Sequence, residues 1–137
     1  MGNFDWSDYL DLSKELLTTH AAVTGHKLAC WRTVVSRAYY AAFHVAADYC
    51  RTKHQRKLGR LNNDYPGRDH DNVCQCLADS RNEEENRIGS WLSGLKMERK
   101  DADYRASDEF DRDRAEMACL SADKIVKTLS ELANRSG

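Results

Sequence analysis

Apolar residues recur along this chain with the period of an α-helix, and no segment alternates apolar and polar residues as a β-strand does. The first such stretch predicts a helix that Asn3 or Asp5 would cap. Thr24 and Gly25 mark its end. The positions on its apolar face are Trp6, Tyr9, Leu10, Ser13, Leu16, Leu17 and His20.

A second, longer helix is predicted from about Lys27 to about Lys57. The alanines in the middle of its apolar seam are small enough to let another helix come close. We therefore expect this helix to lie at the centre of a bundle. The seam has heptad-like spacing and consists of Trp31, Val35, Ala38, Ala42, Val45 and Tyr49.

Helix-breaking residues gather in the middle of the chain, and a short helix is predicted after them. The breaking cluster consists of Gly59, Asn62, Asn63, Asp64, Pro66 and Gly67. Because this cluster is too short to be a domain linker, we expect residues 1–137 to form one domain. Asp69 or Asp71 would cap the short helix. Its buried residues would be Val73, Cys76 and Leu77.

Two further helices are predicted in the C-terminal part. The first covers roughly Glu83 to Arg99, and its Gly89 and Gly94 indicate close backbone packing or a kink. Its buried stripe comprises Ile88, Trp91, Leu92 and Leu95. After a loop over residues 100–106, Ser107 would cap the last helix. The apolar positions of that helix are Ala115, Ala118, Ala122, Ile125, Leu129 and Leu132. The prediction is an all-α, antiparallel bundle of four to five helices.

Segment Ser36–His44 is the most informative for chemistry. Arg37 and His44 are seven residues apart, about two helical turns, so both project from one face with Tyr40 between them. Ala41, beside Tyr40, is small enough to leave room for a ligand. The whole polar stripe consists of Arg37, Tyr40, His44, Asp48 and Arg51.

Such a stripe has the groups needed for metal-independent RNA cleavage. A histidine that titrates near neutrality can move protons to or from the 2′-hydroxyl or the leaving oxygen. An arginine can hold the phosphate and stabilise the charge that develops on it. A helical dimer would bring two stripes into one composite site. The alternative interpretation is a polar helix face that makes structural hydrogen bonds.

Charge limits where nucleic acid can bind. The formal net charge is -1, so any attraction must come from a local patch. The basic cluster in the middle of the chain is either a solvated helix end or a phosphate-contacting surface. It contains Arg51, Lys53, His54, Arg56, Lys57 and Arg60.

The cysteines and the hydropathy of the chain indicate the cellular compartment in which the protein is expected. The chain has five cysteines, an odd number without a C-x-x-C pair, which is typical of neither a disulfide framework nor a zinc site. We expect reduced thiols in a cytoplasmic protein, with no metal and no cofactor. No apolar run approaches the roughly 20 residues of a membrane span, and no signal peptide is visible.

Several motifs resemble landmarks of the HEPN family (higher eukaryotes and prokaryotes nucleotide-binding), in the family's order and across nearly the whole chain. They are Asn3-Phe4-Asp5-Trp6, Ser36-Arg37-Ala38-Tyr39-Tyr40-Ala41-Ala42-Phe43-His44, His70 ahead of Val73, and Arg99 through Ala102-Asp103-Tyr104. The resemblance implies a bundle of four to five helices, usually a homodimer.

The resemblance also implies a choice between two functions. Many HEPN proteins are ribonucleases of toxin–antitoxin, abortive-infection or CRISPR-linked systems, and their motif is an Arg and a His separated by four to six residues. Arg37 and His44 match this motif at its longest spacing. The family's ribonucleases usually have a polar residue after the Arg, whereas this chain has Ala38. Other HEPN domains are non-catalytic and bind a nucleotide or a minimal nucleotidyltransferase.

Residues near the end of the fourth predicted helix have two interpretations. In the structural one, Asp103 braces the last helix and Tyr104 packs its ring, with its hydroxyl bonded across the bundle. In the functional one, Arg99 and Tyr104 hold a phosphate and a base. His70 is expected to be a structural or capping histidine. No partner is evident for His20, His26 or His54.

The leading hypothesis from the sequence is an RNA-directed HEPN protein, a metal-independent endoribonuclease toxin of a prokaryotic defence or toxin–antitoxin system with an antitoxin partner. In it His44 is the general acid/base, Arg37 stabilises the phosphate and Tyr40 orients the substrate. The expected substrate-binding residues are Arg51, Arg99, Asp103 and Tyr104. The alternative is a non-catalytic HEPN homodimer that binds a nucleotide or a minimal nucleotidyltransferase partner.

Overall fold

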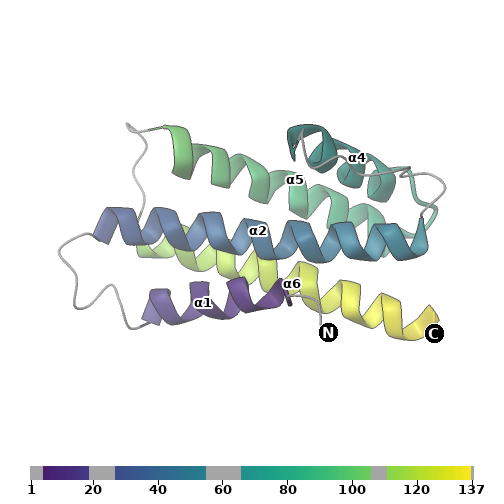
Figure 1. The fold of residues 1–137 in the computed structure, drawn as a ribbon, viewed down its shortest axis with the longest axis horizontal. Coiled ribbons are helices and arrows are strands. Elements are labelled where there is room, and N and C mark those ends of the chain that lie inside the picture. Colours follow the sequence, from purple (N-terminus) through teal and green to yellow (C-terminus); the bar gives the residue numbers. More distant parts are fainter. Residues whose placement is uncertain (1–4, 19–26, 55–65, 106–110, 137) are drawn as a thin grey trace.

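The chain folds into helices packed side by side, as seen in Figure 1. The computed structural model describes residues 5–18, 27–54, 66–105 and 111–136. Its helices are α1 (Ser7–Thr18), α2 (Lys27–Lys53), α4 (Pro66–Ala78), α5 (Glu83–Tyr104) and α6 (Arg112–Ser136). The described ranges contain these five helices and no strand, which confirms that the protein is all-α with a helix count in the predicted range.

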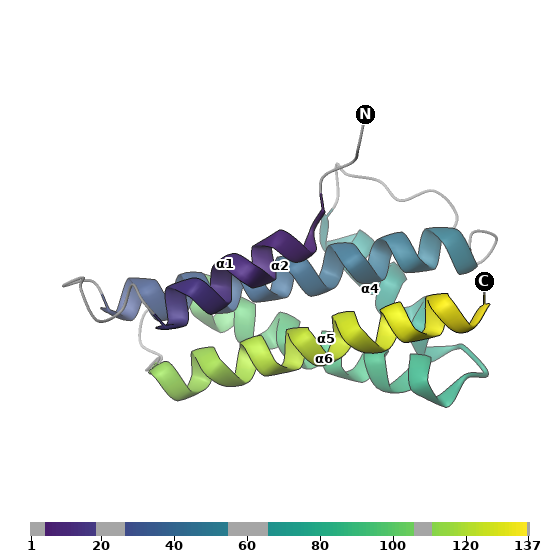
Figure 2. The same ribbon diagram turned by 90° about the horizontal axis from the view of Figure 1, so that it is seen from below.

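Helix α2 is the centre of the bundle, as predicted. It packs against α1, α4, α5 and α6. Helices α1 and α5 flank it without packing on each other, and α4 lies along α5 on the side away from α1 (Figures 1 and 2). Helix α6 closes the bundle against α1, α2 and α5. No other helix in the described part of the chain covers the strip of α2 between α1 and α5, so the side chains on this strip can lie outside the core.

Helices α5 and α6 run antiparallel, as two ion pairs between them show. Arg114 near the start of α6 pairs with Glu98 in the second half of α5. Arg135 at the end of α6 pairs with Glu84 at the start of α5. The pairing order is opposite along the two helices, so their chain directions are opposite. The predicted antiparallel arrangement does not extend to α2 and α6, which run in the same direction (Figure 1).

The core includes most residues of the predicted apolar seams, together with positions that the seams did not contain, such as Val34, Phe43 and Cys50. In α2 the seam residues are buried except for Val45, which is half-buried. All the predicted positions of α6 are buried: Ala115, Ala118, Ala122, Ile125, Leu129 and Leu132. In α5, Trp91 is half-buried and the other three stripe residues are buried. Helical periodicity alone therefore located most of the core.

Helix starts depend on short polar side chains. The Asp5 carboxylate accepts a hydrogen bond from the Ser7 backbone amide at 3.0 Å, which confirms Asp5 as the cap of α1. Asp111 accepts from the Arg114 amide at 2.9 Å, so α6 begins at Arg112 and not after Ser107. Ser107, Asn3, Thr24 and Gly25 lie outside the described residues.

Two helix ends differ from the prediction because of tertiary contacts. Helix α2 ends at Lys53 rather than near Lys57, and the His54 side chain turns towards the carboxylate of Glu85 on α5. Helix α5 runs through the predicted loop to Tyr104.

Arg32 of α2 explains the extra turn of α5. Its guanidinium donates to the carbonyl oxygens of Asp101, Ala102 and Arg105 at 3.1, 2.7 and 2.9 Å. These carbonyls lie at the C-terminal end of α5, where the last carbonyl oxygens have no amide of a following turn to bond them, although the Asp101 oxygen also accepts from the Arg105 amide at 3.1 Å. A cation from another helix therefore caps α5, and no local sequence pattern could indicate it.

Helix α4 begins at Pro66, inside the predicted breaker cluster and ahead of Asp69 and Asp71. Proline suits the first helical turn because the amide it lacks would have no partner there. The predicted burial of Val73, Cys76 and Leu77 is confirmed. None of the described helices has an apolar stretch long enough to cross a lipid bilayer.

The two glycines of α5 have different surroundings. A Cβ atom added at Gly89 would lie 3.2 Å from Leu77 Cβ and 3.4 Å from the Ala78 backbone nitrogen of α4. A Cβ atom added at Gly94 would meet nothing within 4 Å. Close packing is thus confirmed at Gly89, whereas Gly94 has no such packing.

This difference predicts opposite effects of alanine. Gly94→Ala should raise the free energy of unfolding by about 0.5–1 kcal/mol, since alanine favours the helix and meets open space. Gly89→Ala should lower it, because the backbone of α4 must move to admit the methyl group. Urea unfolding followed by circular dichroism measures both. An equal gain in the two variants would contradict the close packing of α4 on α5.

Candidate functional site

The predicted polar stripe lies on the strip of α2 between α1 and α5. Arg37, Tyr40 and His44 are half-buried there, and Asp48 and Arg51 are exposed. Ala41 does not leave room for a ligand as expected, because its side chain is fully buried and the protein itself fills the space around it. Access to the stripe is therefore from solvent and not through a hole beside Ala41.

Aromatic rings of α1 form one rim of the stripe. The Trp6 ring stacks on the His44 imidazole, with the ring centroids 3.7 Å apart and the planes 16° from parallel. The Arg37 guanidinium carbon lies 5.3 Å from the centroid of the Tyr9 ring. An aromatic face attracts a cation without neutralising its charge, so Arg37 keeps its full positive charge here.

Arg99 of α5 forms the opposite rim. Its guanidinium carbon lies 5.0 Å from the Tyr39 ring centroid and 5.8 Å from that of Tyr40. It pairs with Asp103 at 3.5 Å, one helical turn away. The Nε atom of Arg99 is buried and has no hydrogen-bond partner in the described structure. Arg99 is thus brought beside Tyr40, which groups it with Arg37, Tyr40 and His44.

The electrostatics of the strip leave one imidazole neutral and one guanidinium unpaired. Burial lowers the pKa of His44 below its usual value; Arg51 adds to this, and Asp48 opposes it. Neither His44 nitrogen has a hydrogen bond, and Arg37 has no carboxylate partner, within the described ranges. A neutral imidazole whose nitrogens make no other hydrogen bond can accept a proton near neutral pH.

The remaining candidates are less tightly grouped. Arg51 is exposed and pairs with Asp48 three residues before it. Asp103 braces Arg99 on its own helix, not the last helix as the structural interpretation expected. Tyr104 is 74% exposed, so its ring does not pack against the bundle. The three basic residues Arg56, Lys57 and Arg60 lie outside the described residues.

His70 is a buried structural histidine, as expected, and not a cap. Its Nδ1 shares a hydrogen bond of 2.7 Å with the Tyr39 hydroxyl, and its Nε2 lies 3.2 Å from Cys74 Sγ. Burial lowers the pKa of His70 to about 4, and the charges of Lys96 and Arg99 act in the same direction. His70 therefore stays neutral and fixes Tyr39, on which Arg99 is stacked.

His54, for which no partner was expected, belongs to a polar cluster that the sequence did not indicate. The buried Glu85 carboxylate accepts hydrogen bonds from the Tyr49 and Ser80 hydroxyls and contacts His54 Nε2 at 2.9 Å. Burial would raise the pKa of Glu85, but these hydrogen bonds outweigh it and the pKa is lowered. The cluster joins two segments far apart in sequence, residues 49–54 and 80–85, so spacing within either segment could not reveal it.

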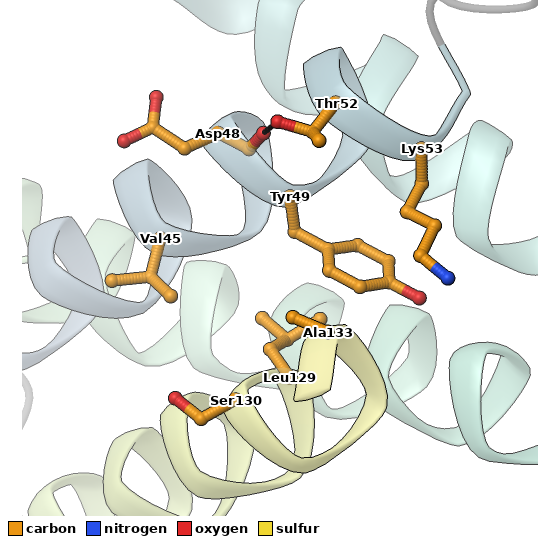
Figure 3. A pocket seen from close by; sticks show the side chains of 8 residues that line it. All are labelled: Val45, Asp48, Tyr49, Thr52, Lys53, Leu129, Ser130 and Ala133. Atoms are coloured by element: carbon orange, nitrogen blue, oxygen red, sulfur yellow. Dashed lines mark hydrogen bonds between the residues drawn. The ribbon is translucent and has the colours of Figure 1, made fainter. Parts of the chain in front are cut away.

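An apolar hollow of about 420 Å³ lies beside this cluster, between α2 and α6. Figure 3 shows Tyr49 of α2 facing Leu129 and Ala133 of α6, with Lys53 at the edge. This hollow is lined by neither Arg37 nor His44. Its lining does include Asp48, so the hollow adjoins the Asp48 end of the polar stripe but not the Arg37 and His44 pair.

Comparison of the chain with models of known protein families, with curated protein sequences and with solved structures gives no significant match in any of the three. The HEPN resemblance therefore stays a prediction. What this chain can do must be argued from its own geometry.

The buried His70 predicts a pH dependence of stability. The unfolded chain binds a proton at His70 from about pH 6.5 downwards, whereas the folded chain binds it only near pH 4. Stability should therefore be lost as pH falls through this window, by about 3 kcal/mol from this residue. Urea unfolding at pH 7, 5.5 and 4 measures the loss. His70→Gln should show a shallower decline, and an equal slope would contradict the assignment.

Proposed function

We propose that this protein is an RNA-directed, metal-independent endoribonuclease of the HEPN type, acting as a toxin in a prokaryotic defence or toxin–antitoxin system. The observation that carries the proposal is the pair Arg37 and His44. They lie two turns apart on a half-exposed strip. The pKa of the histidine is lowered, and no carboxylate among the residues that the structure describes pairs with the arginine.

The chemistry needs no bound ion. His44 accepts the proton of the 2′-hydroxyl, the 2′-oxygen attacks the adjacent phosphorus, and the bond from phosphorus to the 5′-oxygen breaks. Arg37 stabilises the charge that develops on the phosphoryl oxygens. Tyr40 and Arg99 hold the substrate beside them. In a homodimer, the stripe of the second copy would supply the acid that protonates the leaving 5′-oxygen.

A non-catalytic HEPN module is the second candidate. Ala38, which directly follows Arg37, is fully buried, so the polar neighbour typical of the family's ribonucleases is replaced by a core residue. The same strip would then hold the phosphate of a nucleotide, or a nucleotidyltransferase partner, without cleaving it.

RNA cleavage in EDTA separates the two candidates. Purified protein should cleave a generic single-stranded RNA in EDTA. His44→Ala should lower the rate by about 10²–10⁴-fold, because the proton acceptor is lost. Arg37→Ala should lower it by about 10²–10³-fold. A gel or fluorogenic assay measures the rates.

The matched control is Arg112→Ala on α6, an exposed arginine that pairs with Glu116 away from the strip. It should cleave like the wild type, and circular dichroism should show all variants folded. Intact RNA with every folded protein would refute the nuclease. Retained binding of a nucleotide in that case would favour the non-catalytic module.

Tyr104 offers a separate test of RNA contact. Because its ring is 74% exposed, Tyr104→Ala should change the free energy of unfolding by less than about 0.5 kcal/mol. If a base stacks on this ring, single-stranded RNA should bind at least about five-fold more weakly. Fluorescence anisotropy with His44→Ala as background measures binding without cleavage. Met117→Ala, an exposed residue on α6, is the control, and equal affinity would remove Tyr104 from the site.

A further inference from the structure

The imidazole of His44 is held mainly by a ring from another helix. Its contacts are the stacked Trp6 ring at 3.7 Å, the Tyr40 ring at 6.3 Å and the edge of Phe43 at 5.1 Å, all between centroids. No hydrogen bond within the described residues fixes its nitrogens. The plane of the imidazole is therefore set by ring packing, and Trp6 makes the closest contact.

We propose that Trp6 is a positioning residue for His44: its indole covers one face of the imidazole, fixes the plane of that ring and shields it from water. A role of this contact in RNA cleavage rests on the function proposed above. Because the two rings are stacked nearly parallel, the contact covers a face of the imidazole and not its edge, which carries the nitrogens. Trp6 thus presents the histidine in one orientation and favours its neutral form.

The charges around His44 are consistent with Trp6 favouring the neutral form of the imidazole by covering it. On α2, the Asp48 carboxylate raises the pKa of His44 and the Arg51 guanidinium lowers it, but burial is the largest influence. On its other sides, α1 contributes the uncharged indole of Trp6, and Arg99 of α5 lies beyond the Tyr40 ring. Since the local charges oppose each other, covering of the ring decides the direction of the shift.

The cap of α1 places the indole. Asp5 bonds the Ser7 backbone amide at 3.0 Å, and the Tyr9 amide bonds the Trp6 carbonyl at 3.1 Å. Trp6 therefore lies in the turn that opens α1, and its ring also tilts against Tyr9 at 5.9 Å between centroids. The hydrogen bonds at the start of α1 hold Trp6 in place, and the Trp6 ring in turn holds the imidazole of His44.

The experiment is an NMR titration of the His44 ring signals in the wild type, Trp6→Ala and Trp6→Phe. Trp6→Ala should move the pKa of His44 upwards, because one face of the ring becomes hydrated. Trp6→Phe keeps an aromatic cover and should stay close to the wild type. Leu12→Ala, a partly exposed change on α1, is the matched control and should leave the titration unchanged.

The pH–rate profile for RNA in EDTA is the second readout. Its acidic limb should move to higher pH in Trp6→Ala by the same shift as the titration, and stay in place in Trp6→Phe. An unchanged His44 pKa in folded Trp6→Ala would overturn the proposal. If Trp6→Ala unfolds, the wild-type spectrum tests the proposal instead. Nuclear Overhauser contacts between the Trp6 and His44 rings would support the stacking, and their absence would overturn the proposal. A shifted pKa without RNA cleavage would keep the positioning role and refute only the nuclease.

Discussion

The close approach of four helices to α2 is the constraint on which the rest of the structure depends. It is met by small side chains, since Ala38, Ala42, Ala46 and Ala47 are fully buried along α2. An alanine surface lets helix axes come together without costing side-chain entropy. Because so much of α2 is covered, its long polar residues are confined to the strip between α1 and α5. The position of the candidate site is therefore a consequence of core packing.

The same packing determines how positive charge is held on that strip. Arg37 lies against the Tyr9 ring and Arg99 against the rings of Tyr39 and Tyr40. Arg99 also pairs with Asp103, and most other arginines in the described ranges pair with carboxylates, whereas no carboxylate in those ranges pairs with Arg37. Aromatic support keeps a guanidinium in place while leaving its charge available to a phosphate. A chain with a net charge of -1 thus gains a local anion-attracting surface.

Periodicity predicted the helices and most of the core, because burial of an apolar face depends on spacing within one helix. It failed where contacts between helices determine where a helix ends. Arg32 extends α5 by bonding its last carbonyl oxygens, and α2 ends where the His54 side chain contacts Glu85. The stripe of Arg37, Tyr40 and His44 could likewise be placed on one helix from spacing. The stack of Trp6 on His44 could not, because spacing within α1 identified Trp6 only as part of an apolar face.

The three histidines in the described structure are held in different ways, and this difference favours His44 as the proton acceptor that we propose. His54 faces a buried carboxylate, which favours a permanently paired ring. His70 contacts Tyr39 through one nitrogen and Cys74 through the other, so both nitrogens are occupied. His44 alone is held by its faces, with Trp6 as the nearest ring. An imidazole that is held through its faces still has its nitrogens available to a substrate. An imidazole that is held through its nitrogens already uses the atoms that would carry the proton.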